Sequence, residues 1–235
     1  MPDIQITAPD GGSFSAYIAK PAALPAPVLI VIQEIFGVNA EMRARCDALA
    51  REGFIAVCPD LFWRQEPGIQ LTDKTEAEWK RAFELYNGFN VGLGVEDLLA
   101  TLGVCRTLPG TNGKAGCIGF CLGGKLAYLM AARTDVDGAI SYYGVGIEAL
   151  LDEAEDIKTP LLMHIAEEDK FSSKDAQAKI REGLKEFPQI AIYSYPGVNH
   201  AFARPGGEHY DEKATALAGE RSLEFLRETL RLPIN

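Results

Sequence analysis

A strand–turn–helix stretch in the middle of the chain limits the folds open to this sequence. Residues 114–118 form an apolar run typical of a buried strand, and residues 122–133 carry apolar side chains at helical spacing. The few residues between them must turn sharply. Such a turn crowds its neighbours, and the glycines Gly119 and Gly123 lie two residues before and two after Cys121. We therefore expect Cys121 to project from the carboxyl end of a strand.

The rest of the chain alternates between strand-like and helix-like segments. Expected strands are 4–8, 14–19, 28–32, 54–58, 138–143, 160–166 and 190–195, and expected helices are 39–51, 75–89, 95–108, 175–186 and 211–231. The first two strands flank Asp10-Gly11-Gly12 and predict a hairpin. Gly92 and Gly94 are expected to break the chain before residue 95. The alternation predicts one α/β domain over residues 1–235, with a mostly parallel sheet and helices on both faces.

Composition excludes several classes of function. The 235 residues carry a formal net charge of −10, and no basic stripe could neutralise the phosphates of a nucleic acid or an acidic membrane surface. The N-terminus lacks a signal-peptide pattern, and no apolar run reaches membrane-spanning length. Five cysteines without a C-x-x-C pair indicate reduced thiols and a cytoplasmic location. No metal-ligand spacing or dinucleotide motif occurs, so we expect no metal and no cofactor.

Three polar residues follow expected strands in the order Cys121, Asp169, His200. This is the nucleophile–acid–histidine order of an α/β-hydrolase triad, and the glycines around Cys121 match its G-x-S-x-G turn with sulfur in place of oxygen. A thiol must become a thiolate to attack, an imidazole can take its proton, and a carboxylate orients the imidazole. The competing interpretation is that Cys121 is a small buried apolar residue beside an ordinary turn.

Other residues compete for two of these roles. His164 lies inside an expected strand, and we expect it to be a packed core histidine. His209 lies in a polar loop, and we expect it to be solvated. Glu167 and Glu168 directly precede Asp169 in the same loop. Spacing favours Asp169 only modestly, because any of the three acidic side chains could reach inward.

An oxyanion hole needs two backbone N–H donors. The residue after the nucleophile, Leu122, supplies one, and the loop after the strand 28–32 supplies the other, most plausibly at Ile35. Glu34 then stands beside this site, although a glutamate in a surface loop is the alternative. The aromatic residues on one face of the expected helix 75–89 either pack on the core or line the mouth of a pocket; they are Trp79, Phe83, Tyr86 and Phe89.

With these motifs the chain resembles the dienelactone hydrolase (carboxymethylenebutenolidase) family. The matching segments extend over nearly the whole chain, and the two most specific are Gln33-Glu34-Ile35-Phe36-Gly37-Val38-Asn39 and Gly119-Phe120-Cys121-Leu122-Gly123-Gly124. Four further segments match, at residues 58–61, 92–98, 142–146 and 200–204. The resemblance implies a cytoplasmic, monomeric α/β-hydrolase of aromatic catabolism that opens a lactone or enol ester.

The resemblance also implies roles for individual residues. It assigns the acid of a Cys-His-Asp triad to Asp169, and it makes Glu34 the group that accepts the proton of the resting thiol. The substrate-binding residues that it implies are Arg204, Arg81, Phe83, Tyr86, Phe36 and Tyr143. The partner it implies is a small ester or lactone.

The chain departs from the family pattern in the expected helix 75–89. Trp79 stands where an arginine that binds the substrate carboxylate is expected, Phe83 replaces a tyrosine, and Tyr86 replaces a tryptophan. Ala201 also replaces a serine after the histidine. Arg81 or Arg64 could supply the missing cation. A related esterase for a different, less anionic ester is therefore an alternative.

Two further alternatives come from other classes of protein. A glutamine amidotransferase also uses a cysteine in such a turn, but its acid lies close to its histidine in sequence, whereas a helix and a strand separate Asp169 from His200. A non-catalytic small-molecule binder or thiol sensor on the same scaffold is the other alternative. The presence of Cys121 together with Asp169 and His200 argues against lost catalysis.

Overall fold

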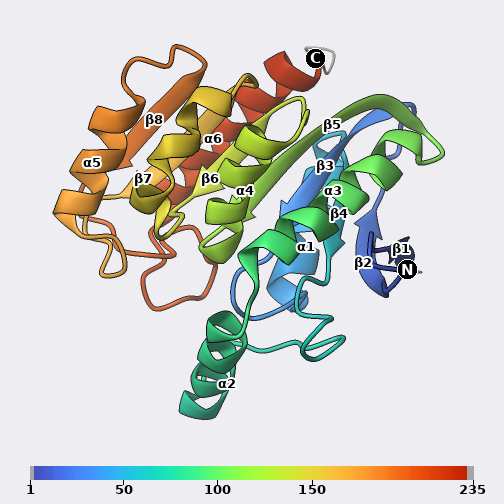
Figure 1. Ribbon diagram of the computed structural model, residues 1–235, viewed down its shortest axis with the longest axis horizontal. Helices are drawn as coiled ribbons and strands as arrows, with labels where there is room; N and C mark the ends of the chain where they lie inside the picture. The colour runs from blue at the N-terminus through green and yellow to red at the C-terminus, as the bar shows by residue number, and fades with distance from the viewer. Residues whose placement is uncertain (1–2, 232–235) are drawn as a thin grey trace. The chain divides into compact units, whose positions relative to one another are not determined.

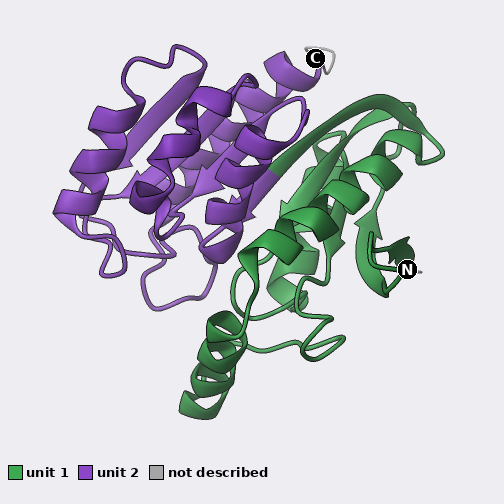
Figure 2. Ribbon diagram, viewed as in Figure 1, with its two compact units in different colours: residues 1–117 green, residues 118–235 purple. Residues whose placement is uncertain are grey.

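The computed structural model describes residues 3–231 and has an α/β fold with an eight-stranded, mostly parallel sheet, as the sequence predicts (Figure 1). The contacts divide the chain into two compact units, residues 1–117 and 118–235 (Figure 2). Strand β5 (Thr111–Phe120) contains the boundary between them. The assignment of residues 1–235 to one domain stays a prediction.

The strands of unit 1 are β1 (Ile4–Thr7), β2 (Ser13–Ala19), β3 (Ala26–Ile32) and β4 (Ile55–Pro59), in the order β1-β2-β4-β3. The predicted hairpin is confirmed, because β1 and β2 pair antiparallel around a turn in which Gly11 has a φ of 88°. Strands β3 and β4 are parallel, and all seven residues of β3 are buried. This burial on both faces explains the continuous apolar run of β3.

Three helices belong to unit 1: α1 (Ala40–Arg51), α2 (Glu76–Asn87) and α3 (Val91–Thr107). Each begins after an N-cap residue whose side chain accepts a backbone N–H bond from the first turn of the helix; the N-caps are Asn39, Thr75 and Asn90. The expectation that Gly92 and Gly94 break the chain is wrong, because both lie inside α3. A Cβ at Gly94 would lie 2.4 Å from the ring of Phe89, so close packing explains this glycine.

Unit 2 contains the parallel strands β6 (Ala139–Tyr142), β7 (Leu161–Ala166) and β8 (Ile190–Tyr195), in that order. Its helices are α4 (Leu122–Arg133), α5 (Lys174–Leu184) and α6 (Glu212–Leu230), close to the predicted bounds. Two short 3₁₀ helices, η1 (Ile147–Ala149) and η2 (Leu151–Asp156), were not predicted. Their length is too small for an apolar period to be visible in the sequence.

Helices cover both faces of the strands in unit 2. Tyr142 and His164 are neighbours in register, and both bond to Ser222 of α6. The side chains of the adjacent positions point to the other face. There Ser141 and Met163 line a small internal cavity together with Ile180 of α5.

His164 is a core histidine, as the sequence predicts. It is buried, its Nδ1 lies 2.8 Å from the Tyr195 hydroxyl, and its Nε2 lies 2.9 Å from the Ser222 hydroxyl. Burial, and then the positive charge of Arg221, lower the pKa of His164 to about 3. A histidine that stays neutral in this way acts as a structural link between β7 and α6.

Within residues 3–231, no single helix has both the length and the apolar character needed to cross a bilayer. Helices α2 and α3 reach that length and composition only as a pair, and they are bent by 88° where they meet.

Candidate active site

The turn between β5 and α4 holds Cys121 in a strained backbone conformation. Its φ is 56° and its ψ is −114°, a region that residues other than glycine seldom adopt and that costs about 1 to 3 kcal/mol. Its N–H donates to the Tyr142 carbonyl at 3.0 Å, and its own carbonyl accepts from Gly124 at 3.0 Å and from Lys125 at 3.2 Å. These bonds fix the turn from both sides. Cys121 is partly exposed, whereas the other four cysteines are buried.

Close backbone contacts explain the glycines of this turn. A Cβ at Gly119 would lie 1.9 Å from the carbonyl oxygen of Gly123, a distance that the backbone cannot accept. A Cβ at Gly124 would lie 2.5 Å from the carbonyl oxygen of Tyr142. The expected crowding is confirmed at Gly119, and the structure adds Gly124 as a second position that needs glycine.

Asp169 and His200 form a buried pair in unit 2. The Asp169 Oδ2 lies 2.8 Å from the His200 Nδ1, and the two residues are 7% and 4% exposed. Asp169 follows β7, and His200 follows β8, which is hydrogen-bonded to β7. The other carboxylate oxygen of Asp169 accepts the Phe171 N–H at 2.8 Å. Both oxygens of the carboxylate are therefore engaged, which fixes its orientation toward the imidazole.

The loop after β7 distinguishes the three acidic residues that the sequence left in competition. Glu168 is exposed and pairs with Lys174 at 2.9 Å, and Glu167 is partly exposed. Asp169 is the member of the three that is buried and bonded to His200. The direction of each side chain in this loop, which spacing could not give, separates them.

Gln177 of α5 supports the loop that carries Asp169. Its side-chain Nε2 donates to three backbone carbonyls, at 3.2 Å to Ala166, 3.2 Å to Glu167 and 2.8 Å to Ser172. Sequence reasoning missed this residue. The signal was available, because Gln177 lies on the same helical face as the buried Ile180 and Leu184, where a polar side chain needs a buried partner.

The surroundings of His200 favour its protonated form. Burial alone would lower its pKa, but the charge of Cys121, hydrogen bonds to Asp169 and Cys121, and the charge of Asp169 together raise the pKa of His200 to about 10. Tyr143 and Phe171 stand edge-on to the imidazole, with centroid distances of 5.1 Å and 4.8 Å.

The remaining expected site residues of unit 2 lie in this region or close to it in sequence. Tyr143 has a φ of 38° and packs on His200. Leu122 is the first residue of α4, so its N–H has no acceptor within the helix. Arg204 is 9% exposed, and its backbone N–H donates to the carbonyl of Ala201, which has a φ of 61°.

The expected site residues near the end of β3 lie in unit 1 and are buried. Glu34, Ile35 and Phe36 are 2%, 5% and 1% exposed. The burial of Glu34 argues against the alternative of a surface glutamate. The ring of Phe36 packs edge-on against Trp79 of α2, with a centroid distance of 5.0 Å.

Helix α2 carries the other expected substrate-binding residues of unit 1. Trp79 stacks on Phe83 with a centroid distance of 5.6 Å, and Phe83 is 38% exposed, while Tyr86 is partly exposed. The buried residues of α2 are Ala82 and Leu85, so its aromatic face is not simply core.

Neither arginine offered as a substitute cation is unpaired. Arg81 bonds Glu66 at 2.6 Å and Glu84 at 2.8 Å. Arg64 bonds Asp97 at 2.8 Å and stacks over Trp63. Each guanidinium would have to leave these partners to bind a substrate carboxylate.

Comparison with known proteins places this site in a family. The sequence model described as "Dienelactone hydrolase family" matches residues 14–230, which include Cys121, Asp169 and His200. The chain belongs to the dienelactone hydrolase family. A protein of Azospirillum brasilense that is provisionally named a carboxymethylenebutenolidase is 50% identical over 98% of this chain and 100% of its own length. The carboxymethylenebutenolidase of Pseudomonas putida is 43% identical over 95% of this chain and 94% of its own.

A solved structure agrees with this assignment. The provisionally named dienelactone hydrolase of Klebsiella pneumoniae is 28% identical, with a TM-score of 0.85, and the match covers 97% of this chain and 98% of that one. Family membership over nearly the whole chain makes this protein a carboxylic ester or lactone hydrolase with the α/β-hydrolase fold.

Proposed function

We propose that this protein opens a lactone or enol ester with the thiolate of Cys121, assisted by His200 and Asp169. One observation carries the proposal: the buried imidazole of His200 lies 2.8 Å from the Asp169 carboxylate, the arrangement that orients a histidine base. The charge of Cys121 helps to raise the pKa of His200 to about 10. A thiolate–imidazolium pair supplies a nucleophile and an acid at neutral pH without a metal. A thiolate suits an activated ester, whose enolate leaves readily.

The proposed reaction has two steps. The Cys121 sulfur attacks the acyl carbon, and backbone N–H groups of Leu122 and Ile35 stabilise the negative oxygen of the tetrahedral intermediate. The intermediate expels the enolate, which takes a proton from His200, and leaves a thioester on Cys121. His200 then removes a proton from water, and the hydroxide that forms releases the acid and regenerates the thiolate.

We also propose a role for Glu34, the buried carboxylate beside Ile35. This role is the alternative to the resting ion pair: the resting sulfur is then a neutral thiol, and Glu34 accepts its proton when substrate binds. Replacing Glu34 by glutamine removes the acceptor and keeps the volume, so we expect a lower rate and a changed pH–rate profile with little loss of stability. A Glu34→Gln variant with the parent's rate and profile would refute this role.

The substrate class follows from two observations. The relatives are named carboxymethylenebutenolidases, which favours a dienelactone-like substrate. However, Trp79 and Phe83 form an aromatic pair on α2 of which Phe83 is exposed and Trp79 partly exposed, and Arg81 is neutralised by Glu66 and Glu84. These contacts favour an ester that carries less negative charge. We propose Arg204, the buried arginine that follows His200, as the residue that binds any carboxylate of the substrate. The protein is further proposed to be a cytoplasmic monomer.

The proposal is tested by steady-state hydrolysis of cis- and trans-dienelactone beside p-nitrophenyl acetate, with and without iodoacetamide. We expect turnover that iodoacetamide abolishes and that Cys121→Ala lacks. Cys46→Ala is the matched control, because Cys46 is fully buried and should change neither result. Turnover of the neutral ester alone would favour the less anionic substrate. Unchanged activity in Cys121→Ala would refute the proposal. No turnover of any of the three esters would favour either a different substrate or a non-catalytic binder.

A further inference from the structure

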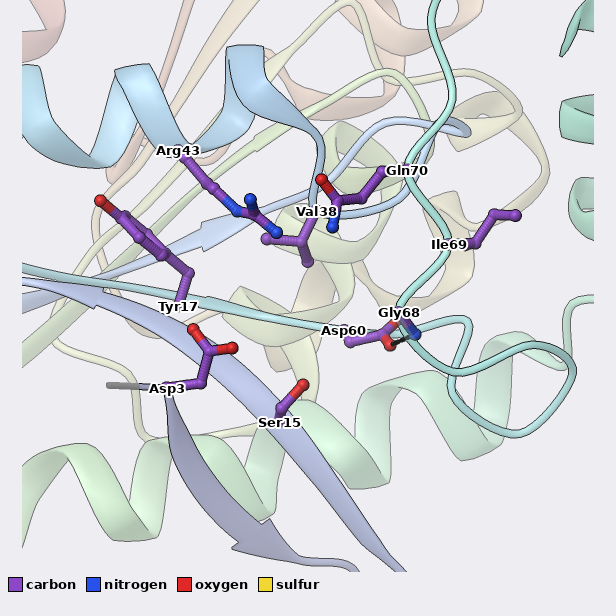
Figure 3. A pocket seen from close by; sticks show the side chains of 9 residues that line it. All are labelled: Asp3, Ser15, Tyr17, Val38, Arg43, Asp60, Gly68, Ile69 and Gln70. Atoms are coloured by element: carbon purple, nitrogen blue, oxygen red, sulfur yellow. Dashed lines mark hydrogen bonds between the residues drawn. The ribbon is translucent and has the colours of Figure 1, made fainter. Parts of the chain in front are cut away.

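A small pocket in unit 1 gathers polar groups that the proposed reaction does not use. It has a volume of about 90 Å³ and is lined by strand β2, helix α1 and the loop 60–70 (Figure 3). Ser15 and Tyr17 come from β2, and Arg43 comes from α1. Every lining residue belongs to unit 1.

Arg43 is the main unsatisfied group of this pocket. Its Nε is buried and has no hydrogen-bond partner within residues 3–231, and no carboxylate in that range pairs with its guanidinium. The guanidinium carbon of Arg43 lies 5.8 Å from the centroid of the Tyr17 ring. A buried guanidinium N–H without an acceptor is unusual in a folded protein. A ligand atom could supply the acceptor that the chain does not.

Two further polar groups face the same space without a protein partner among the described residues. They are the Ser15 hydroxyl and the Gln70 side-chain amide. Figure 3 shows the Arg43 and Gln70 side chains pointing toward one another from α1 and the loop. A guanidinium fork, an amide and a hydroxyl together can bind a planar oxyanion through several N–H and O–H donors.

The wall opposite Arg43 is already ordered. The Asp60 carboxylate accepts the Gly68 N–H at 2.7 Å and the Phe62 N–H at 3.1 Å, and the Asp60 N–H donates to the Ser15 carbonyl at 3.0 Å. These bonds hold the loop against β2 without any ligand. A site formed in advance loses little conformational entropy when a ligand binds.

Charge limits the type of anion. Asp3 and Asp60 also line the pocket, so a dianion such as phosphate would be repelled by two carboxyl groups. The Asp60 carboxylate accepts two backbone N–H groups, which offset part of its repulsion of a singly charged ligand. The volume limits the ligand to a few heavy atoms.

We propose that this pocket is a binding site for a small monocarboxylate, held by the Arg43 guanidinium with the Gln70 amide and the Ser15 hydroxyl. The carboxylate plane lies against the Arg43 fork in a bidentate pair. The site is separate from the proposed triad in its residues, and the proposal does not depend on the proposed function.

The test is an NMR titration of the full chain with sodium acetate, against sodium chloride at equal ionic strength. The signals followed are the Arg43 Nε–H and the Gly68 amide. We expect acetate to shift both saturably, and chloride and phosphate to shift them little. An acetate response no different from that of chloride would overturn the proposal.

Variants separate the site from general charge effects. Arg43→Gln should abolish the acetate response of Gly68, whereas Arg45→Gln, on the same helix but paired with Glu41, should keep it. Arg43→Lys keeps the positive charge but lacks the two-pronged guanidinium, so it should weaken acetate binding. It is the variant to use if Arg43→Gln does not fold. Asp3→Asn removes a repulsive charge and should tighten acetate binding by about 2- to 5-fold, since exposed charges interact weakly. A Gly68 response that persists in both Arg43 variants, or an affinity that falls in Asp3→Asn, would contradict the proposed ligand set.

Discussion

The protonation of His200 tests the proposed ion pair without a substrate. Burial lowers the pKa of this imidazole, and the charge of Cys121 is the largest of the effects that outweigh burial and raise the pKa to about 10. Replacing Cys121 by alanine removes that charge and its hydrogen bond but keeps Asp169. The loss of an adjacent opposite charge lowers a histidine pKa by about 1 to 3. This change corresponds to about 1.4 to 4 kcal/mol of interaction with the imidazolium.

The assay is an NMR titration of the histidine ring carbons between pH 5 and 11 in the parent and in Cys121→Ala. The parent should show His200 charged through neutral pH and losing its proton near pH 10. His164, whose pKa burial lowers to about 3, should stay neutral over the whole range and serves as an internal control. A His200 signal that titrates at the same pH in both proteins would refute the argument, because the thiolate would then not stabilise the imidazolium.

Two other perturbations test how the turn and the acid loop are held. Gly119→Ala places a Cβ 1.9 Å from the Gly123 carbonyl and should cost more than about 3 kcal/mol by chemical denaturation, whereas Gly219→Ala in α6, with nothing within 4 Å, should stabilise by about 0.4 to 1 kcal/mol. Equal stabilities for the two variants would contradict the crowding argument. Gln177→Glu turns a carboxylate toward three carbonyl oxygens and should lower kcat about 10-fold or more with a smaller change in KM, with Gln177→Asn recovering part of the rate. A parent-like kcat in Gln177→Glu would show that the loop does not need this support.

Most of the strands and helices could be predicted because their signals are local. The apolar run 28–32 and the N-cap Asn39 each predict one element from neighbouring residues, and the structure confirms both. Gly92 and Gly94 misled the prediction because glycine lowers helix propensity, whereas the packing of the Phe89 ring, visible only in three dimensions, accounts for Gly94.

The candidate site was predictable in its order but not in its orientation. Parallel strands bring their carboxyl ends to one edge, so chain order alone indicated Cys121, Asp169 and His200. The choice of Asp169 over its two acidic neighbours depends on which side chain the loop turns inward, and sequence spacing does not carry that information. The helical position of Gln177 indicated a buried polar side chain, but the sequence does not show that its amide turns back onto the loop that precedes α5.

The most direct test of the account is to find the acyl group. The protein is mixed with p-nitrophenyl acetate, quenched in acid within the first turnovers, digested and analysed by peptide mass spectrometry. The account predicts an acetyl thioester on the peptide that contains Cys121, and none on peptides that contain only the buried Cys46, Cys58 or Cys105. Acetylation of a different residue, or continued turnover in Cys121→Ala with no acyl-enzyme, would contradict the claim that this thiol is the nucleophile.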